Sequence, residues 1–487
     1  MMLWRLAGGP QVRTTKGSRM FQVDAGQVTG PGATPGGSRY CDGMSRRHFV
    51  KLGVAGMAAA GLPDVLRAKA ASAELGHEAK DTRVILVWMD GGPGHMDMYD
   101  MKPDAPPEYR GLWSPIATNV KGIEISELFP RQAKVADKFS IVRSLYHNSG
   151  DHFAAGHVML TGRFGASGAS TAQRAPFIGA MATAVTGSRR PGLPAHAAVP
   201  YASSIGLRPG YFGGNYAGAR FNPFETDGDP NAEKFKVNNL DLPGGMSVQR
   251  LDDRRGLREK FDKLRRDVDQ TGMMDSMDRF DQQAYGMVTS AQARAAFDLS
   301  QEPKELRERY GRNSWGQSML LARRLAEAGV TFTSVHLGGW DHHWDLWKGY
   351  ENYLPKVDMG LAALFQDLHD RSLMKNVLVV VCGEFSRTPR MNDGGNGGAP
   401  MSQGTPGRDH WGNSMFCLLA GGGLKMGQLV GKTDRKGEAP IERPYTPSDL
   451  HTTIYHVLGV DPAVAFLNHS GRPTRAIEDG KLIEELV

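Results

Sequence analysis

Short runs of β-branched and other apolar residues recur along the chain after residue 80, and turn-forming residues bound each of them. Runs of this length and composition are typical of strands. They alternate with stretches in which apolar residues recur at helical spacing, which is the pattern of an α/β fold with a mainly parallel central sheet flanked by helices. The predicted strands are Arg83–Met89, Phe139–Leu145, Thr331–Leu337, Val377–Cys382 and Met415–Ala420.

The stretches with helical spacing are longer than these runs. The predicted helices are His152–Leu160, Ala172–Val185, Val248–Val268, Gln282–Ala296, Trp315–Ala328, Val357–His369 and Ser448–Leu458. Two segments interrupt the alternation. Residues 201–245 are rich in aromatic residues and Asn and are punctuated by Gly and Pro, so we expect a long loop beside the site. Residues 250–310 are highly charged, so about 200–310 is predicted as a helical insertion with solvated faces.

Charge is distributed unevenly along the chain. The 487 residues contain 58 Lys and Arg against 52 Asp and Glu, a formal net charge of +6. Ten basic and three acidic residues fall within residues 1–73, so that 48 basic and 49 acidic residues follow. Because the basicity belongs to the first segment, the composition of the remainder does not indicate a nucleic-acid partner.

Residues 44–73 resemble a twin-arginine export signal. S-R-R-H-F-V-K begins at Ser45, a Gly/Ala-rich apolar stretch follows from Leu52 to Leu62, and small residues precede A-x-A-like cleavage positions after Ala70 or Ala73. The resemblance implies export in the folded state by the twin-arginine translocase to the periplasm or the exterior. The apolar stretch is too short and too rich in Gly to span a bilayer stably, and we expect no transmembrane helix in the mature chain.

Residues 1–43 are rich in Gly, Pro and Thr and show no periodicity. Export signals of this kind begin close to the start of a protein, so we expect 1–43 to be disordered and to lie upstream of a true start at Met44. For residues 44–73, the alternative to an export signal is a chance pair of arginines before a buried helix. Residues 74–487 are then expected to form the folded domain.

Acidic and imidazole side chains gather where the predicted strands end. Ligands in open α/β sheets bind beyond the carboxyl ends of the strands, so these residues are candidates for a site. Carboxylates and imidazoles without cysteine suit Zn, Mn, Mg or Ca. Asp341 and His343 are two residues apart, so both can face one cation. The alternative is that Asp341 caps a turn and His343 packs on a tryptophan. The candidate ligands are Asp90, Asp97, Asp341, His343, Glu384, Asp409 and His410.

Several motifs resemble the family known as domain of unknown function 1501. They are G-G-P-G-H-M-D (91–97), H-F-A-A-G-H-V-M-L-T-G-R (152–163), G-G-W-D-H-H (338–343), G-E-F-S-R-T-P (383–389) and G-R-D-H-W (407–411). The family is grouped with sulfatase-like, alkaline-phosphatase-type hydrolases. The resemblance implies that fold, one or two divalent cations, and hydrolysis at a sulfur or phosphorus centre.

Carried over residue by residue, the resemblance places Asp90 or Asp97, the Asp341–His343 pair, Glu384 and His410 around the cations. It also implies that Arg387 or Arg408 binds an anionic ester oxygen through its planar guanidinium, although an ion pair with a neighbouring carboxylate is an equal alternative.

The chain departs from sulfatases at the residue that supplies the nucleophile. His152 stands where sulfatases carry a modifiable Cys or Ser, so chemistry based on formylglycine is excluded. The remaining candidates are the hydroxyl of Ser149 or a metal-bound hydroxide with His152 or His157 as proton carrier. Ser149 can also serve as a helix N-cap.

Two functions follow from these features. The first is an exported metal-dependent hydrolase of sulfate or phosphate esters, whose substrate is an anionic ester such as a sulfated glycan. The second is a non-catalytic exported binding protein that keeps the sulfatase-like fold.

Overall fold

The structure is a computed structural model, and it describes residues 80–164, 175–237, 240, 247, 249–253, 284–392 and 405–487. The segments expected to be an export signal (44–73) and a disordered leader (1–43) lie outside these residues. All described residues belong to one compact unit, Gly53–Val487. None of the helices among the described residues is long and apolar enough to cross a membrane.

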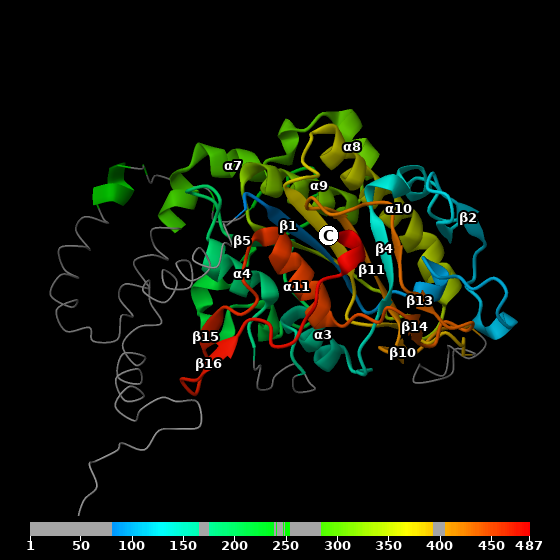
Figure 1. Cartoon of the computed structure of the whole chain (residues 1–487). Helices are drawn as coiled ribbons and strands as arrows, with labels where there is room; N and C mark the ends of the chain where they lie inside the picture. Colours follow the sequence, from blue (N-terminus) through cyan, green and yellow to red (C-terminus); the bar gives the residue numbers. More distant parts are fainter. Residues whose placement is uncertain are drawn as a thin grey trace, which may run out of the picture. The chain divides into compact units, whose positions relative to one another are not determined.

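An eight-stranded sheet forms the centre of the described residues, in the order β12-β4-β11-β8-β1-β7-β5-β6 (Figure 1). Its strands are β1 (Arg83–Asp90), β4 (Ser140–Leu145), β5 (His196–Val199), β6 (Phe224–Glu225), β7 (Phe332–Gly338), β8 (Val377–Cys382), β11 (Met415–Gly421) and β12 (Leu429–Val430). All five predicted strands are confirmed, with bounds that differ by at most one residue.

The sheet is mainly parallel, as predicted. β1 pairs in parallel with both β7 and β8, and β7–β5, β5–β6 and β12–β4 are also parallel pairs. β11 runs antiparallel to its neighbours β4 and β8. The amino end of β11 therefore lies at the same edge of the sheet as the carboxyl ends of β1, β4, β5, β7 and β8.

Alternate residues of β1 point into two separate hydrophobic cores. Ile85, Val87 and Met89 pack in the core that contains α9 (Ser314–Ala328) and α10 (Leu346–Asp370). Val84, Leu86 and Trp88 pack in the core that contains α3 (His152–Thr161), α4 (Ile178–Thr186) and α11 (Pro447–Leu458). A strand buried on both faces reads as a continuous apolar run, which explains the strand signal in the sequence. Helices therefore cover both faces of the sheet (Figure 1).

Smaller elements complete the described structure. They are the two-stranded sheets β2 (Pro115–Ala117)–β3 (Glu124–Ser126), β9 (Ser386–Arg387)–β10 (His410–Trp411), β13 (Lys432–Thr433)–β14 (Pro440–Glu442) and β15 (Ala465–Leu467)–β16 (Pro473–Arg475), the helices α7 (Ala291–Phe297) and α8 (Lys304–Tyr310), and 3-10 turns that include η4 (Gly210–Phe212).

Several predicted helices have different bounds. α4 begins at Ile178, after Pro176, rather than at residue 172, and residues 172–174 lie outside the described part. The helix predicted over Gln282–Ala296 is interrupted at Ser290, whose side chain caps α7 by accepting from Ala293 N. Only 249–253 of the helix predicted over Val248–Val268 is described.

The largest difference is at α10, which begins eleven residues before the predicted start at Val357. Pro355 suggested a helix boundary, because proline removes one backbone hydrogen bond and clashes with the preceding turn. The helix nevertheless continues through it, with Leu346, Tyr350 and Leu354 buried on the same side. Burial of an apolar face outweighs the local penalty here.

Candidate metal centre and adjoining pocket

Five segments that are far apart in the chain meet at the edge of the sheet where β1, β7 and β8 end. Asp90 ends β1, Asp341 follows β7, and Glu384 follows β8. His152 opens α3, which follows β4, and His410 precedes the reversed strand β11. The single antiparallel strand is therefore what brings His410 to this edge.

Asp341 lies at the centre of a cluster of basic groups. The Nε2 atoms of three histidines surround its carboxylate: that of His152 lies 3.3 Å from Oδ2, and those of His343 and His410 lie 3.0 and 3.1 Å from Oδ1. Arg387 donates from Nη2 to Oδ1 at 2.7 Å. Burial raises the pKa of Asp341, but hydrogen bonds from His152, His343 and His410 outweigh it and hold the pKa well below its usual range.

Each of these histidines is anchored through its other ring nitrogen. Nδ1 of His152 lies 2.7 Å from Glu384 Oε1, Nδ1 of His343 lies 2.7 Å from Asp409 Oδ1, and Nδ1 of His410 lies 2.7 Å from the carbonyl of Gly150. Carboxylate and carbonyl oxygens accept hydrogen bonds, so each Nδ1 carries a proton. A ring that donates to Asp341 through Nε2 therefore carries a second proton, and when that proton is lost the Nε2 lone pair faces Asp341.

This donor set fits a metal ion. The ligand atoms of His152, Asp341 and His410 lie within 4.8 Å of one another, and the Nε2 atoms of His343 and His410 are 3.0 Å apart. Two neutral rings that each carry the proton on Nδ1 repel at that distance unless a proton or a cation lies between them. Imidazole nitrogens fixed by carboxylates or carbonyls behind them are the usual support of a metal site, and three nitrogens with one carboxylate suit Zn²⁺.

The three imidazoles differ in their affinity for protons. Burial lowers the pKa of His152, but the hydrogen bonds with Asp341 and Glu384 outweigh it and raise the pKa to about 9. The hydrogen bond with Asp341 also raises the pKa of His343. Burial lowers the pKa of His410, against a smaller opposite effect of Asp341. A cation would compete with protons most strongly at His152.

Glu384 and Asp90 form a second, deeper pair of acids. Glu384 Oε1 accepts from the backbone N–H of Gly91 at 2.9 Å, which joins the residue after Asp90 to this carboxylate. Burial raises the pKa of Glu384, His152 opposes the shift, and the negative charge of Asp90 adds to it. Both carboxylates are buried, and within the described part of the chain Asp90 Oδ1 and Glu384 Oε2 have no hydrogen-bond partner.

The structure places three other predicted residues outside the cluster of imidazoles. Asp97 is fully buried in an ion pair with Arg408, 2.9 Å from Nε to Oδ2, and also accepts from Leu112 N. Ser149 accepts weakly from Asp151 N at 3.4 Å. Asp151, rather than Ser149, is the N-cap of α3. Arg387 contacts Asp341 from behind, and its guanidinium is fully buried against the carbonyls of residues 91, 92 and 408.

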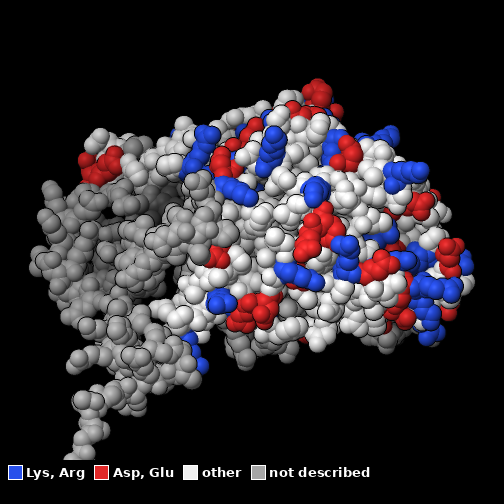
Figure 2. Space-filling view, in the orientation of Figure 1, with Lys and Arg blue, Asp and Glu red and all other residues white. Residues whose placement is uncertain are grey.

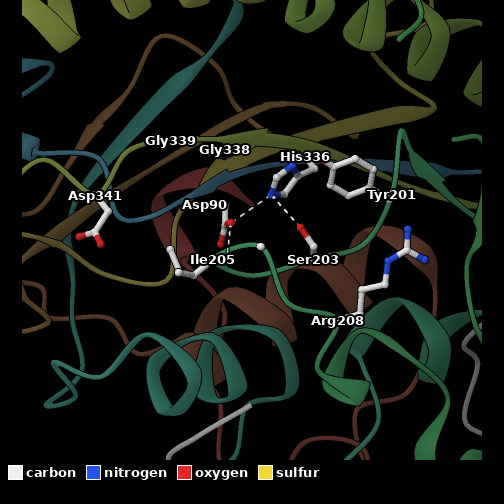
Figure 3. Close-up of a pocket in the computed structure, with 10 residues that line it drawn as sticks. Asp90, Tyr201, Ser203, Ile205, Arg208, His336, Gly338, Gly339 and Asp341 are labelled. Atoms are coloured by element: carbon white, nitrogen blue, oxygen red, sulfur yellow. Dashed lines mark hydrogen bonds and ion pairs between the residues drawn. The ribbon is translucent and has the colours of Figure 1, made fainter. Parts of the chain in front are cut away.

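A pocket of about 500 Å³ opens next to Asp90 and Asp341 (Figure 3). Asp90 and Asp341 lie on its lining, and Gly338 and Gly339 contribute bare backbone. The rest of the lining comes from β7 and from the segment that follows β5, namely His336, Tyr201, Ser203, Ile205, Gly206 and Arg208.

His336 connects the two sides of the pocket. Its Nε2 lies 3.0 Å from Asp90 Oδ2 and 3.3 Å from Ser203 Oγ, as the dashed lines in Figure 3 show. The ring of Tyr201 packs on His336 with centroids 5.1 Å apart. Arg208 is exposed and pairs with Glu225. The pocket therefore combines one aromatic wall with hydroxyl, imidazole and guanidinium donors.

Sequence reasoning missed the residues of this pocket outside the acids. His336 is the only imidazole within strand β7. A histidine in a predicted buried strand could have marked this position as a candidate site residue. Ser203 and Tyr201 follow β5, a strand of only four residues, H-A-A-V, that was too short and too rich in Ala to be predicted. The loop expected over 201–245 does begin beside the site.

The surface in Figure 2 shows Lys and Arg interspersed with Asp and Glu on the face that is drawn. In this view neither sign of charge covers a continuous area of the described residues.

Comparisons with known proteins give one family match and distant structural likenesses. The sequence profile of a family described as "Protein of unknown function (DUF1501)" matches residues 81–487. A search of curated proteins finds no match to the chain.

Three of the similar solved structures are a sulfatase, a synthase and a hydrolase. The PsFucS1 sulfatase from Pseudoalteromonas sp. is 12% identical with a TM-score of 0.33, over 82% of this chain and 72% of that one. The lipoteichoic acid synthase LtaP from Listeria monocytogenes is 9% identical with a TM-score of 0.33, over 79% and 73%. The phosphonate monoester hydrolase SpPMH from Silicibacter pomeroyi is 12% identical with a TM-score of 0.31, over 83% and 76%.

Proposed function

The chain belongs to the DUF1501 family of proteins of unknown function, and we propose that it is an exported metal-dependent hydrolase of sulfate or phosphate esters. The observation that carries the proposal is the convergence of three imidazole Nε2 atoms on Asp341, each ring being fixed from behind by an oxygen acceptor. A cation between these groups would accept all three Nε2 lone pairs and the carboxylate together, whereas without one the rings must take up protons to donate to Asp341.

In this proposal His152, His343, His410 and Asp341 hold the cation. The bound cation supplies Lewis acidity, which polarises an ester oxygen and stabilises the charge that develops on it. Asp409 and Glu384 keep the His343 and His152 rings in the tautomer that exposes Nε2.

Arg387 acts as a positioning residue. Its guanidinium is buried and donates to the carbonyl of Gly92 and to Asp341, so it fixes the orientation of that carboxylate rather than reaching into the pocket. The ion pair also offsets the negative charge of the Asp341 carboxylate.

The pocket beside Asp341 is assigned to the alcohol portion of the ester. A pocket of about 500 Å³ is within the usual range for small-molecule sites. The ring of Tyr201 offers an apolar face, and Ser203 and His336 offer hydrogen bonds, a combination that suits a sugar ring. Arg208 at the same pocket suits a second anionic group, as in a sulfated glycan.

A binding protein without turnover remains the second candidate. One observation favours it: within the described residues, no hydrogen bond joins the Ser149 hydroxyl to an imidazole, and both ring nitrogens of His152 face acids. Among the described residues the Ser149 hydroxyl therefore has no side-chain base within hydrogen-bond distance, and Ser149 and a metal-bound hydroxide with His152 or His157 as proton carrier both stay candidates for the nucleophile.

Export is proposed from residues 44–73 alone, which resemble a twin-arginine signal. The translocase is then the partner during export, and the mature protein is released in the periplasm or outside the cell. An amino-terminal sequence that begins shortly after Ala70 or Ala73 in the cell envelope fraction supports this step.

Metal analysis followed by turnover tests the proposed function. We expect the folded protein, after chelation and reloading, to retain one equivalent of Zn²⁺ and to hydrolyse an aryl sulfate or an aryl phosphate. Asp341→Ala and His343→Ala should each weaken retention at least about tenfold. His369→Ala, an exposed histidine on α10, is the matched control.

The possible results separate the two candidates. Retention of metal without turnover on either panel favours the binding protein. Unchanged retention in both Asp341→Ala and His343→Ala contradicts the metal centre itself.

A further inference from the structure

Two cysteines face each other across the antiparallel junction of the central sheet. β8 pairs with β11 in a register that opposes Leu418 to Val381. The next position along both strands places Cys417 opposite Cys382, so the two side chains lie on the same face of the sheet. Both are free cysteines, and the third cysteine of the chain, Cys41, lies outside the described residues.

The two thiols are in contact inside the hydrophobic core that contains α3, α4 and α11. Cys382 and Cys417 are 2% and 1% exposed, and both belong to that core. Burial raises the pKa of the Cys417 thiol, and a hydrogen bond with the Cys382 thiol adds to the shift. The two sulfur atoms are therefore neighbours in the folded chain while both thiols are reduced.

The backbone at this pair suits a disulfide. Directly opposed residues of antiparallel strands have Cα atoms about 4.5 to 5.5 Å apart. A disulfide requires a Cα separation of about 4.4 to 6.8 Å. Rotation of the two side chains can therefore form the bond while the strands stay paired.

We infer that Cys382 and Cys417 form a disulfide between β8 and β11 once the chain reaches an oxidising compartment. The proposed export supplies that compartment, because thiols stay reduced in the cytosol and oxidise in the periplasm or outside the cell. A chain exported in the folded state must hold the two thiols together before oxidation, and the register of the two strands does so. The inference rests on the proposed export and is independent of metal binding and ester hydrolysis.

The bond forms by exchange with a disulfide oxidant such as oxidised glutathione. One protein thiolate attacks a glutathione sulfur and releases one glutathione thiol, and the other protein thiolate then attacks the mixed disulfide and releases the second. The two protein thiols lose two protons and two electrons in total, and the oxidant takes them up as two glutathione thiols. Because both sulfur atoms are buried, the exchange needs brief opening of this end of the sheet and is slow.

The bond closes the segment that carries much of the imidazole cluster. Four residues described at the site lie between the two cysteines in the sequence, namely Glu384, Arg387, Asp409 and His410. A disulfide stabilises mainly by restricting the unfolded chain, and the effect grows with the number of residues that it closes. The bond therefore favours the folded form of this segment whether or not a cation is bound.

Counting thiols tests the inference directly. The full chain carries Cys41→Ser, so that Cys382 and Cys417 are its remaining cysteines, and it is incubated with oxidised glutathione or kept reduced. Labelling with a maleimide in denaturant should find two free thiols in the reduced chain and none in the oxidised one. Peptide mass spectrometry without reductant should then find the peptide that contains Cys382 joined to the peptide that contains Cys417.

Thermal unfolding measures the effect of the bond on stability. Reductant should lower the Tm of the oxidised chain by about 2–4 °C. Cys382→Ala and Cys417→Ala, each in the Cys41→Ser background, are the matched controls, because each keeps a single thiol. Reductant should leave the Tm of both variants unchanged. Each comparison is made within one protein, so the cost of the substitution itself does not affect it.

Three results overturn the inference. They are two free thiols after oxidation, glutathione attached to the cysteines in place of the joined peptides, and a Tm that reductant lowers equally in the oxidised chain and in the two variants. The chain recovered from cells separates the inference from the proposed export. Free thiols in a chain found in the periplasm contradict the disulfide and leave export standing. A chain that stays in the cytosol, but whose thiols join in oxidised glutathione, contradicts export and leaves the disulfide standing.

Discussion

At the scale of single residues, the protonation of Nδ1 decides what the imidazole cluster can bind. His152, His343 and His410 each have that atom opposite an oxygen that can only accept. The spacing of Asp341 and His343 allowed these two to be predicted together. The anchors could not be assigned in the same way: Asp409 and Glu384 were expected as ligands, and the structure places both behind a ring.

Asp409→Ala tests the role of such an anchor. Removing the carboxylate behind His343 frees the ring to rotate and to change tautomer, so we expect Zn²⁺ affinity to fall by about 10- to 100-fold. Isothermal titration of the metal-free protein measures this, with Asp370→Ala on the exposed end of α10 as the control. An unchanged affinity would show that Asp409 does not orient the ring.

His196 gives a second prediction at this scale, one that is independent of metal. It lies buried between Phe177 and Phe332, and burial lowers its pKa to about 4. The unfolded chain has a histidine pKa of about 6.5, so below that pH the unfolded state binds the proton first and stability falls until about pH 4. We expect a loss of about 2 kcal/mol between pH 7 and pH 5 from this residue.

His196→Phe should remove that part of the acid sensitivity, because phenylalanine fills the same aromatic stack without titrating. The decrease in Tm between neutral pH and about pH 5 should be smaller in the variant than in the wild type. His451, whose pKa burial also lowers to about 4, keeps part of the dependence in both. An equal decrease in the two proteins would contradict the assignment.

At the scale of elements, two features position the cluster. α3 begins at His152 because Asp151 caps it, accepting from Ala154 N at 2.8 Å. β11 runs against its neighbours, so a residue before this strand meets residues that follow the others. Periodicity and β-branched runs predicted the strands. The direction of β11 could not be predicted from its own residues, because it depends on the neighbouring strands. Pro355 likewise led us to predict the start of α10 at Val357 instead of Leu346.

Asp151→Ala and Thr446→Ala form a matched pair at this scale. Both remove a helix cap, Thr446 being the N-cap of α11 with a capping box through Asp449, and each should cost about 1 kcal/mol of stability. Only α3 carries a residue of the cluster at its first position. We therefore expect Zn²⁺ affinity to fall about fivefold in Asp151→Ala, the equivalent of that energy, and to stay unchanged in Thr446→Ala.

Thermal unfolding and zinc titration measure the two effects separately. A similar loss of affinity in both variants would show that it reflects general destabilisation rather than the position of His152.

At the scale of the whole molecule, the strand order explains why distant motifs share one site. β8, β1 and β7 are adjacent and parallel, so Glu384, Asp90 and Asp341 leave the sheet at one edge. This much follows from the parallel sheet that the sequence predicts. The position of Asp97 could not be predicted in the same way. This residue lies seven positions after Asp90 and was expected as a ligand, but the path of the loop buries it in an ion pair with Arg408.

X-ray absorption at the zinc edge tests the central claim most directly. The folded full chain, loaded with one equivalent of Zn²⁺, should show four nitrogen or oxygen ligands at about 2.0–2.1 Å, with the outer-shell scattering of three imidazoles. An oxygen-only shell without imidazole scattering, or zinc that washes off the folded protein, would contradict the account.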